Sequence, residues 1–169
     1  MKPLLNLCLA LASLALGQAA LAQATAVTST LTAQRVEMVD GKAVLKPAGQ
    51  GKPGEVIEYS GSYRNASTAA VDKLQAVVPV PVGTTLVAGS AQPAAAQAST
   101  DGVRFAPMPL MRTVRQADGT ERTEPVPLAE YRALRWDVGT LAAGASTLVR
   151  LRARIDPAGT PVAASSVKP

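Results

Sequence analysis

The sequence predicts an all-β fold in which antiparallel strands pack as a sandwich. Valine, threonine, alanine, glycine and proline are abundant beyond residue 22, and no long window keeps the apolar spacing of a helix. Short runs that alternate apolar and polar residues recur instead, and turn-forming residues separate them. A period of two is typical of strands that are buried on one face, and many short strands divided by turns are typical of a sandwich or barrel.

The N-terminal segment has the layout of a secretory signal peptide. Lys2 supplies a positive charge, Leu4 to Leu16 form an apolar run, and Ala20-Leu21-Ala22 is an A-x-A cleavage signal. We place the cut before Gln23, and a second signal, Ala22-Gln23-Ala24, would place it slightly later. A membrane anchor would need about 20 uninterrupted apolar residues. We therefore expect an exported protein, periplasmic or extracellular, with no membrane span in the mature chain.

Cys8 is the one cysteine of the chain. Leu7 and Asn6 precede it, whereas a lipoprotein signal needs a small residue directly before the cysteine, so we do not expect lipidation. Cleavage removes Cys8, and the mature chain can then form no internal disulfide. Residues 23–156 are enough for one domain with its own core. Residues 157–169, small and polar with prolines, are predicted to form a flexible tail.

Charge and composition argue against a nucleic-acid partner. The full chain has 17 basic and 12 acidic residues, a net charge of +5, and one lysine leaves with the signal peptide. Nucleic-acid-binding modules usually have a denser basic surface. Aromatic residues make up only 3% of the chain, whereas proteins that bind single strands stack bases on several aromatic rings.

The first strands are predicted to form a hairpin. Val27 to Met38 is followed by Asp40-Gly41, a dipeptide that favours a two-residue turn, and Ala43 to Leu45 returns from it. A further strand follows the turn signal Lys52-Pro53-Gly54. Its alternation places Ile57, Tyr59, Gly61 and Tyr63 on one face and Glu58, Ser60, Ser62 and Arg64 on the other.

The middle of the chain has weaker patterns. Leu74, Ala76, Val78 and Val80 alternate with polar residues, and Pro79, Pro81 and Gly83 then indicate an edge strand or a strand end. Thr84 to Ala88 is predicted as a short strand, and Gly89 to Thr100 as a flexible connection. Gly102 to Phe105 is predicted as a brief strand. Arg112 to Pro127 is predicted as a polar hairpin or excursion around Asp118-Gly119.

The strongest pair of strands comes last. Leu134, Trp136 and Val138 face one way and Arg135 and Asp137 the other, and Val149, Leu151, Ala153 and Ile155 oppose Arg150, Arg152 and Arg154. Gly139 to Ser146 joins the two runs. We expect them to be antiparallel neighbours with one buried and one solvated face.

Four segments resemble one known family. The sequence Lys52-Pro53-Gly54-Glu55-Val56-Ile57-Glu58-Tyr59, the corner Tyr63-Arg64-Asn65-Ala66-Ser67 and the step Val77-Val78-Pro79-Val80-Pro81-Val82-Gly83-Thr84 follow one another as in the domain of unknown function 11. The closing Leu134-Arg135-Trp136-Asp137-Val138-Gly139-Thr140-Leu141-Ala142-Ala143-Gly144 is similar to that family's ending. The resemblance covers roughly residues 27 to 155. It implies an immunoglobulin-like sandwich of about seven strands from a bacterial exported or surface protein, and no defined activity.

Three aromatic residues are predicted to build the core. Trp136 is the only tryptophan and lies on the apolar face of its strand, where filling the space between two sheets is favoured over stacking on a ligand. Tyr59 and Tyr63 lie on the apolar face of theirs. We assign all three to structure.

Nothing in the sequence indicates catalysis. The chain has no histidine, and the mature chain has no cysteine, so the most common general base, the thiolate nucleophile and the soft metal ligands are absent. The Ser165-Ser166-Val167-Lys168 match to S-x-x-K lies in the tail. The carboxylates are dispersed and specify neither a glycosidase pair nor a calcium loop. We therefore expect no enzyme activity, no cofactor and no metal.

One candidate binding surface is a row of arginines. Side chains two apart on a strand share a face, so Arg150, Arg152 and Arg154, with Arg135 on the expected neighbouring strand, could bind an anionic envelope polymer in a bidentate manner. The alternatives are a solvated face partly neutralised by acidic residues, Asp137 and Glu130, or an edge that charge protects from aggregation.

A second candidate is the edge of the first strand. Val27 to Thr32 is long and uncharged, and an exposed edge of this kind can pair with a strand of another protein. The alternative is an ordinary first strand covered by its own sheet. We expect a non-enzymatic binding or assembly module of the bacterial envelope, or an accessory domain that packs on another envelope protein.

Overall fold

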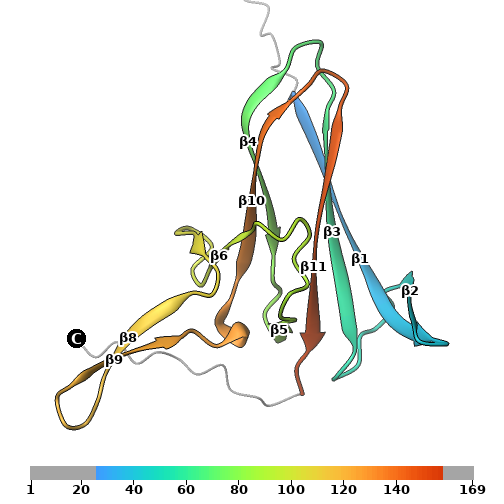
Figure 1. The fold of residues 1–169 in the computed structure, drawn as a ribbon. Coiled ribbons are helices and arrows are strands. Elements are labelled where there is room, and N and C mark those ends of the chain that lie inside the picture. The colour runs from blue at the N-terminus through green and yellow to red at the C-terminus, as the bar shows by residue number, and fades with distance from the viewer. Residues whose placement is uncertain (1–25, 158–169) are drawn as a thin grey trace, which may run out of the picture.

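The computed structural model describes residues 26–157, which form β-strands arranged in antiparallel sheets (Figure 1). The expected signal peptide and residues 158–169 of the expected tail lie outside the described residues. The strands are β1 (Val27–Val39), β2 (Lys42–Pro47), β3 (Val56–Asn65), β4 (Val71–Pro79), β5 (Thr84–Leu86), β6 (Gln97–Ser99), β7 (Ala106–Pro107), β8 (Met111–Arg115), β9 (Glu121–Pro125), β10 (Ala133–Leu141) and β11 (Ser146–Ile155). One 3-10 turn, η1 (Leu128–Glu130), precedes β10.

Two antiparallel sheets pack face to face and confirm the predicted sandwich. The larger sheet has the order β2-β1-β3-β11-β5, and the smaller has the order β4-β10-β6-β7. The strands β8 and β9 pair only with each other and form an arm that projects from the sandwich (Figure 1). Residues 26–157 form eleven strands instead of about seven, because the short strands β5 to β7 and the arm add to the long ones.

The core lies between the sheets, where the inward residues of four long strands meet. Its largest buried side chains include Val78, Tyr131, Leu134, Val149 and Leu151. The alternation predicted for β3, β4, β10 and β11 is confirmed, because a residue whose side chain points inward is followed by one that points out.

The predicted core aromatics lie at this interface. Trp136 is 2% exposed, and its indole nitrogen donates a hydrogen bond of 2.6 Å to the carbonyl oxygen of Pro93. Tyr59 and Tyr63 are partly buried against the core. Burial raises the pKa of Tyr59.

The first hairpin forms as the sequence predicts. Val39 pairs with Lys42 across a turn of two residues, Asp40 at φ 50° and Gly41 at φ 76°. Two successive positive φ values define the turn that matches the twist of a hairpin, and aspartate followed by glycine adopts them readily.

The expected pairing of the last two strands is wrong. β10 pairs with β4 and β6, whereas β11 pairs with β3 and β5. The connector between β10 and β11 crosses from one sheet to the other. Both strands bury one face in the same core, and two strands in opposite sheets satisfy that pattern as well as two neighbours do.

The predicted flexible connection Gly89 to Thr100 is also wrong. It contains β6, which pairs with β10, and Ala98 is fully buried. The predicted strand Gly102 to Phe105 is not formed, and β7 follows it instead. The predicted hairpin around Asp118-Gly119 is confirmed as β8 and β9.

Candidate functional site

The arginine row of β11 covers a buried carboxylate. Glu58, on the neighbouring strand β3, is 4% exposed. Its carboxylate accepts a hydrogen bond of 2.8 Å from Nε of Arg152, and Nη1 of Arg150 lies 3.9 Å from the other oxygen. Removal of Arg152 should be costly, because it would leave the buried charge of Glu58 without its hydrogen-bonding partner. Arg152 therefore has a structural role, and Arg150 adds a longer ion pair to the same carboxylate.

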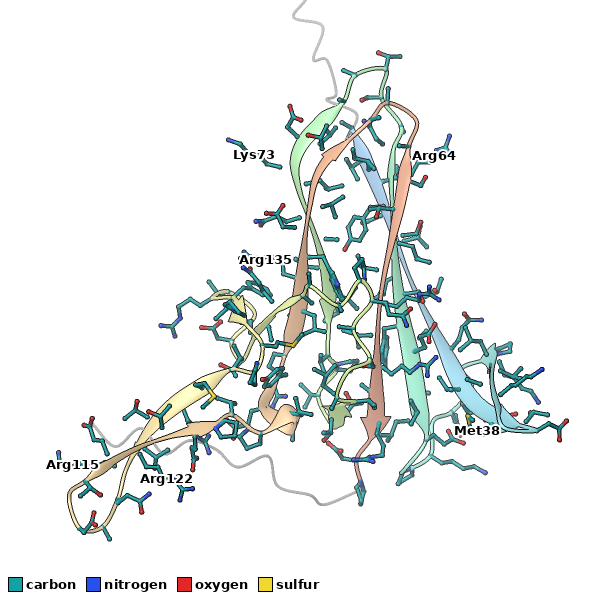
Figure 2. All side chains as sticks on the ribbon, viewed as in Figure 1. Met38, Arg64, Lys73, Arg115, Arg122 and Arg135 are labelled. Carbon is teal, nitrogen blue, oxygen red and sulfur yellow. The ribbon has the colours of Figure 1, made fainter. Side chains whose placement is uncertain are left out.

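The other two candidate arginines differ in position. Arg154 continues the row at the end of β11 and is exposed. Arg135 lies on β10 in the opposite sheet, hydrogen-bonded to the side-chain oxygen of Gln97 and 4.5 Å above the ring of Phe105 (Figure 2). The expectation that Arg135 lies beside the row is wrong, because it assumed that β10 and β11 are neighbours.

The two acidic residues named in the alternative of a neutralised face do not contact the row. Glu130 binds Arg112 at 2.9 Å instead, at the base of the β8–β9 arm, and the Asp137 carboxylate accepts a bond from the Gly139 amide. Glu58 was predicted on the polar face of its strand. Only the pairing of β3 with β11 brings it to Arg152, which is 94 residues away in sequence.

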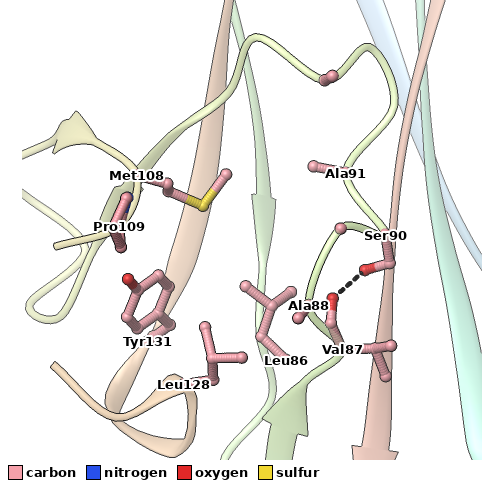
Figure 3. Close-up of a pocket in the computed structure, with 11 residues that line it drawn as sticks. Leu86, Val87, Ala88, Ser90, Ala91, Met108, Pro109, Leu128 and Tyr131 are labelled. Atoms are coloured by element: carbon pink, nitrogen blue, oxygen red, sulfur yellow. Dashed lines mark hydrogen bonds between the residues drawn. The ribbon is translucent and has the colours of Figure 1, made fainter. Parts of the chain in front are cut away.

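A cavity of about 300 Å³ opens between the β5–β6 connection and η1 (Figure 3). Its lining is mostly apolar and consists of Leu86, Val87, Ala88, Gly89, Ser90, Ala91, Ala94, Met108, Pro109, Leu128 and Tyr131. The Ser90 hydroxyl donates to the carbonyl of Val87 at 2.7 Å, and the Tyr131 hydroxyl accepts from the Leu110 amide at 2.8 Å. The lining has no ionisable group except Tyr131, so it offers no acid–base pair.

The N-terminal half of β1 is an open sheet edge. β3 pairs with Val27–Val36 on one side, but β2 covers only Gln34–Val39 on the other. Within the described residues, the segment Val27–Ala33, which we call the open edge, therefore has a strand on one side only. Figure 1 shows β2 beside the far end of β1, with the upper part of β1 free of it.

The odd-numbered residues of the open edge direct their backbone groups outward. The Ala26 carbonyl accepts a bond from the Ala66 amide beyond β3, and the Asn65 amide bonds to Ala145 on the opposite side of β3. Backbone groups alternate in direction along an antiparallel strand. The amides and carbonyls of the odd-numbered residues, Val27, Ser29, Leu31 and Ala33, thus point away from β3.

The side chains of the open edge are uncharged and accessible. Thr28, Thr30 and Thr32 lie on the outer face of the sheet, opposite Arg64, Ser62 and Ser60 of β3. Leu31 points to the inner face, yet it is 50% exposed, because the smaller sheet does not extend over β1. An exposed apolar side chain beside free backbone groups is a surface suited to strand addition.

The edge of the smaller sheet, by contrast, is blocked at β4. The Tyr63 hydroxyl reaches across from β3, donates to the carbonyl of Val77 at 2.7 Å and accepts from its amide at 2.9 Å. Lys73 has φ 55°, a conformation that interrupts a regular strand. Pro79 ends β4 and has no amide to offer. A second strand cannot pair along β4 without displacing Tyr63.

The other sheet edges also carry protective features. The outer strand β2 has Lys42, Lys46 and Pro47, while β5 has three residues and β7 has two, one of them Pro107. Lysine, proline and very short strands are the usual protection of sheet edges. Within residues 26–157, the open edge of β1 is seven residues long and lacks such protection. In the same range, Ser146–Val149 of β11 also has no strand on the side away from β3, because β5 covers only Ala153–Ile155 and Gln92 bridges Arg150, but this stretch has only four residues.

No family model, no curated protein and no solved structure matches the chain. In the described part of the chain, no three histidine, cysteine, aspartate or glutamate residues are grouped as metal ligands. Residues 26–157 include no helix long and apolar enough to span a membrane.

Proposed function

We propose that the chain is an exported, non-enzymatic assembly module that binds a strand of another protein chain along the open edge. The observation that carries the proposal is the contrast between edges. β2, β4, β5 and β7 are protected by lysine, proline, a tyrosine hydroxyl or short length, whereas Val27–Ala33 has none of these. An unprotected edge of uncharged residues is an aggregation hazard unless another strand covers it.

The backbone supplies the affinity in this mode of binding. Four residues of the open edge present an amide and a carbonyl each, and an added strand would satisfy them in alternating pairs. Leu31, which is half-exposed, would gain a neighbour on the inner face. The resemblance to the domain of unknown function 11 supports a non-catalytic role in the cell envelope.

A second candidate function is packing as an accessory domain on another envelope protein. The β1–β2 ribbon extends beyond the smaller sheet and leaves apolar side chains exposed on both faces: Met38, Val39, Val44 and Leu45. Met38 is 68% exposed and lies at the outer end of the ribbon (Figure 2). A partner that packed here would contact side chains and would not need the backbone of the open edge.

Site-specific crosslinking in the cell tests the assembly function. A photoreactive residue replaces Leu31, or Val82 as a control that is highly exposed outside the open edge. We expect a discrete crosslinked product at position 31 that is lost when Ser29 is also changed to proline. The Ser29 amide points outward, so proline removes a free donor and spares the bonds to β3.

The identity of the crosslinked product and the position of the probe distinguish strand addition from packing as an accessory domain. A defined product from position 31 that disappears with Ser29→Pro supports strand addition, whether mass spectrometry identifies this chain or another. Equal products from positions 31 and 82 would contradict it. A product from a probe at Met38 that persists in Ser29→Pro would instead favour the accessory domain.

A further inference from the structure

We propose that the strand bound by the open edge is the open edge of a second copy of this chain, so that two larger sheets join into one across a two-fold axis. This inference rests on the proposed assembly function and names its partner. The central residue of the pairing is Thr30, which would lie opposite its own counterpart.

The direction of the backbone amides and carbonyls along the open edge permits this pairing. Only odd-numbered residues point outward, so the two copies can bond only where odd residues face odd residues. Antiparallel pairing centred on Thr30 places Val27 opposite Ala33 and Ser29 opposite Leu31 of the second copy. The outward amides and carbonyls of all four residues in each copy then form hydrogen bonds across the seam. Val27 exchanges them with Ala33 of the second copy, and Ser29 exchanges them with Leu31.

The open edges of the two copies can pair over their whole length. Pro47 of β2 lies opposite Gln34 and closes the edge at that end. Pairing centred on Thr30 uses Val27 to Ala33 of each copy and ends just before Gln34, where Pro47 of β2 covers β1. A register centred one residue towards β2 would oppose odd residues to odd residues as well, but it would drive Val27 of one copy against the β2 strand of the other.

The side chains of this register complement one another. On the outer face, Thr28 lies opposite Thr32 of the second copy, and Thr30 lies opposite Thr30. These positions make no backbone bond across the seam, so their side chains approach most closely, and threonine pairs across antiparallel strands are stabilising.

The contact between the two copies places no like charges directly together. Residues 27–33 contain no charged side chain, and Arg35, the nearest in sequence, pairs with Glu37 at 2.6 Å. On the inner face, the exposed Leu31 side chains of the two copies lie diagonally across the seam, where they shield each other from water.

The test uses opposite charges at the axis. The protein, purified after export, is studied by sedimentation over a range of concentrations, with Thr30→Lys, Thr30→Glu and the matched control Thr113→Lys on the arm. We expect a wild-type dimer, and dimerisation weaker by about tenfold or more in each Thr30 variant, because like charges then face each other. An equimolar mixture of the two Thr30 variants should restore a dimer, and Thr113→Lys should behave as wild type.

Hydrogen exchange supplies a second readout. On dimerisation the amides of Val27, Ser29, Leu31 and Ala33 should become protected, while those of Thr28, Thr30 and Thr32 are already protected by β3. The mixing experiment guards against misfolding, because a variant that had lost its fold would not be rescued by its opposite.

The outcomes distinguish the two proposals. A wild-type protein that stays monomeric, with a crosslink from position 31 to a different protein, would overturn self-pairing and leave the assembly function standing. A dimer that is indifferent to Thr30→Lys and Thr30→Glu would overturn self-pairing, because the contact would then lie away from the open edge. If position 31 also gave no crosslinked product that Ser29→Pro removes, the assembly function would be overturned as well.

Discussion

At the scale of single residues, Trp136 connects the two halves of the core. Its ring is buried between the sheets and its indole nitrogen bonds to the Pro93 carbonyl, so it ties β10 to the irregular segment before β6. We predict that Trp136→Ala lowers the free energy of unfolding by about 3–5 kcal/mol, because truncation of a large aromatic leaves a cavity. Urea unfolding followed by circular dichroism measures this.

A surface substitution provides the control for that prediction. Val82 is highly exposed, so Val82→Ala should change the free energy of unfolding by no more than about 0.5 kcal/mol. Equal losses in the two variants would show that the space around Trp136 is filled by rearrangement of its neighbours.

The carboxylate of Asp101 makes a contribution to folding stability that depends on pH. The amides of Arg104 and Val103 donate to its carboxylate at 2.8 and 2.9 Å, and together with the Arg104 side chain and the Ser99 hydroxyl they hold the pKa of Asp101 far below its usual range. A lowered folded pKa stabilises the fold at pH values above the unfolded value, about 4, and this contribution disappears as the pH falls through the folded value.

We predict that Asp101→Asn destabilises the protein at pH 7 and that this difference narrows below about pH 4, where the Asp101 carboxylate of the unfolded chain takes up a proton while that of the folded protein stays charged. Unfolding curves collected from pH 7 to pH 2 measure the difference. Val103→Ala, at an exposed side chain that leaves the amide in place, is the control. A difference that stayed constant with pH would contradict an electrostatic role for Asp101.

At the scale of elements, Tyr63 decides which sheet edge is closed. Its hydroxyl both donates to and accepts from the backbone of Val77. We predict that Tyr63→Phe costs about 1–2 kcal/mol, because two hydrogen bonds with a usual net value of about 1 kcal/mol each are lost, and that the Val77 amide exchanges faster with solvent. Hydrogen exchange followed by NMR measures this, with Tyr59→Phe as the matched control. Unchanged exchange at Val77 in Tyr63→Phe would show that the hydroxyl does not protect this edge.

The sequence predicts the long strands well and the short ones poorly, for a physical reason. Val149 to Ile155 alternates because a whole face of β11 is buried, and that burial leaves a period-two pattern. β6 buries Ala98 and Ser99, and small residues of this kind also occur in loops, so no local pattern marks the strand. Which strands are neighbours depends on contacts distant in sequence, so the separation of β10 from β11 was not predictable.

The candidate site was predictable only in part. The uncharged run Val27 to Thr32 stands out in the sequence, but whether its edge is free depends on where β2 ends, and the structure shows that β2 ends at Pro47, opposite Gln34 of β1. The arginine row was equally visible. Its buried counterion, Glu58, lies on a strand distant in sequence, and the pattern that placed Glu58 outward gave no sign that Arg152 covers it.

At the scale of the whole molecule, three parts differ in how they relate to the core. The sandwich contains the buried side chains, the β1–β2 ribbon extends one sheet beyond the other, and the β8–β9 arm projects from the opposite side (Figure 1). Arg115 and Arg122 lie on the arm (Figure 2). The open edge and the arm thus lie on different sides of the molecule.

The arm should be dispensable for folding, because its strands bond only to each other and most of its side chains are exposed. At its base, Arg112 bonds to Glu124 and Glu130, and these carboxylates raise the pKa of the guanidinium. The Gln116 amide bonds to the Thr120 carbonyl, so the alternation along the ladder makes Arg112 and Glu124 a hydrogen-bonded pair, which a two-residue turn can close.

We predict that replacing residues 113–123 by Asn-Gly leaves the free energy of unfolding within about 1 kcal/mol of wild type, because little buried surface is lost. Calorimetry should still show one cooperative transition, and the matched control Arg112→Ala, which breaks the joint but keeps the arm, should be destabilised more than the deletion. A deletion that unfolds, or that loses cooperativity, would mean that the arm forms part of the folding unit. A stable deletion that still dimerises through Thr30 would place fold, assembly edge and arm in three separable parts of the chain.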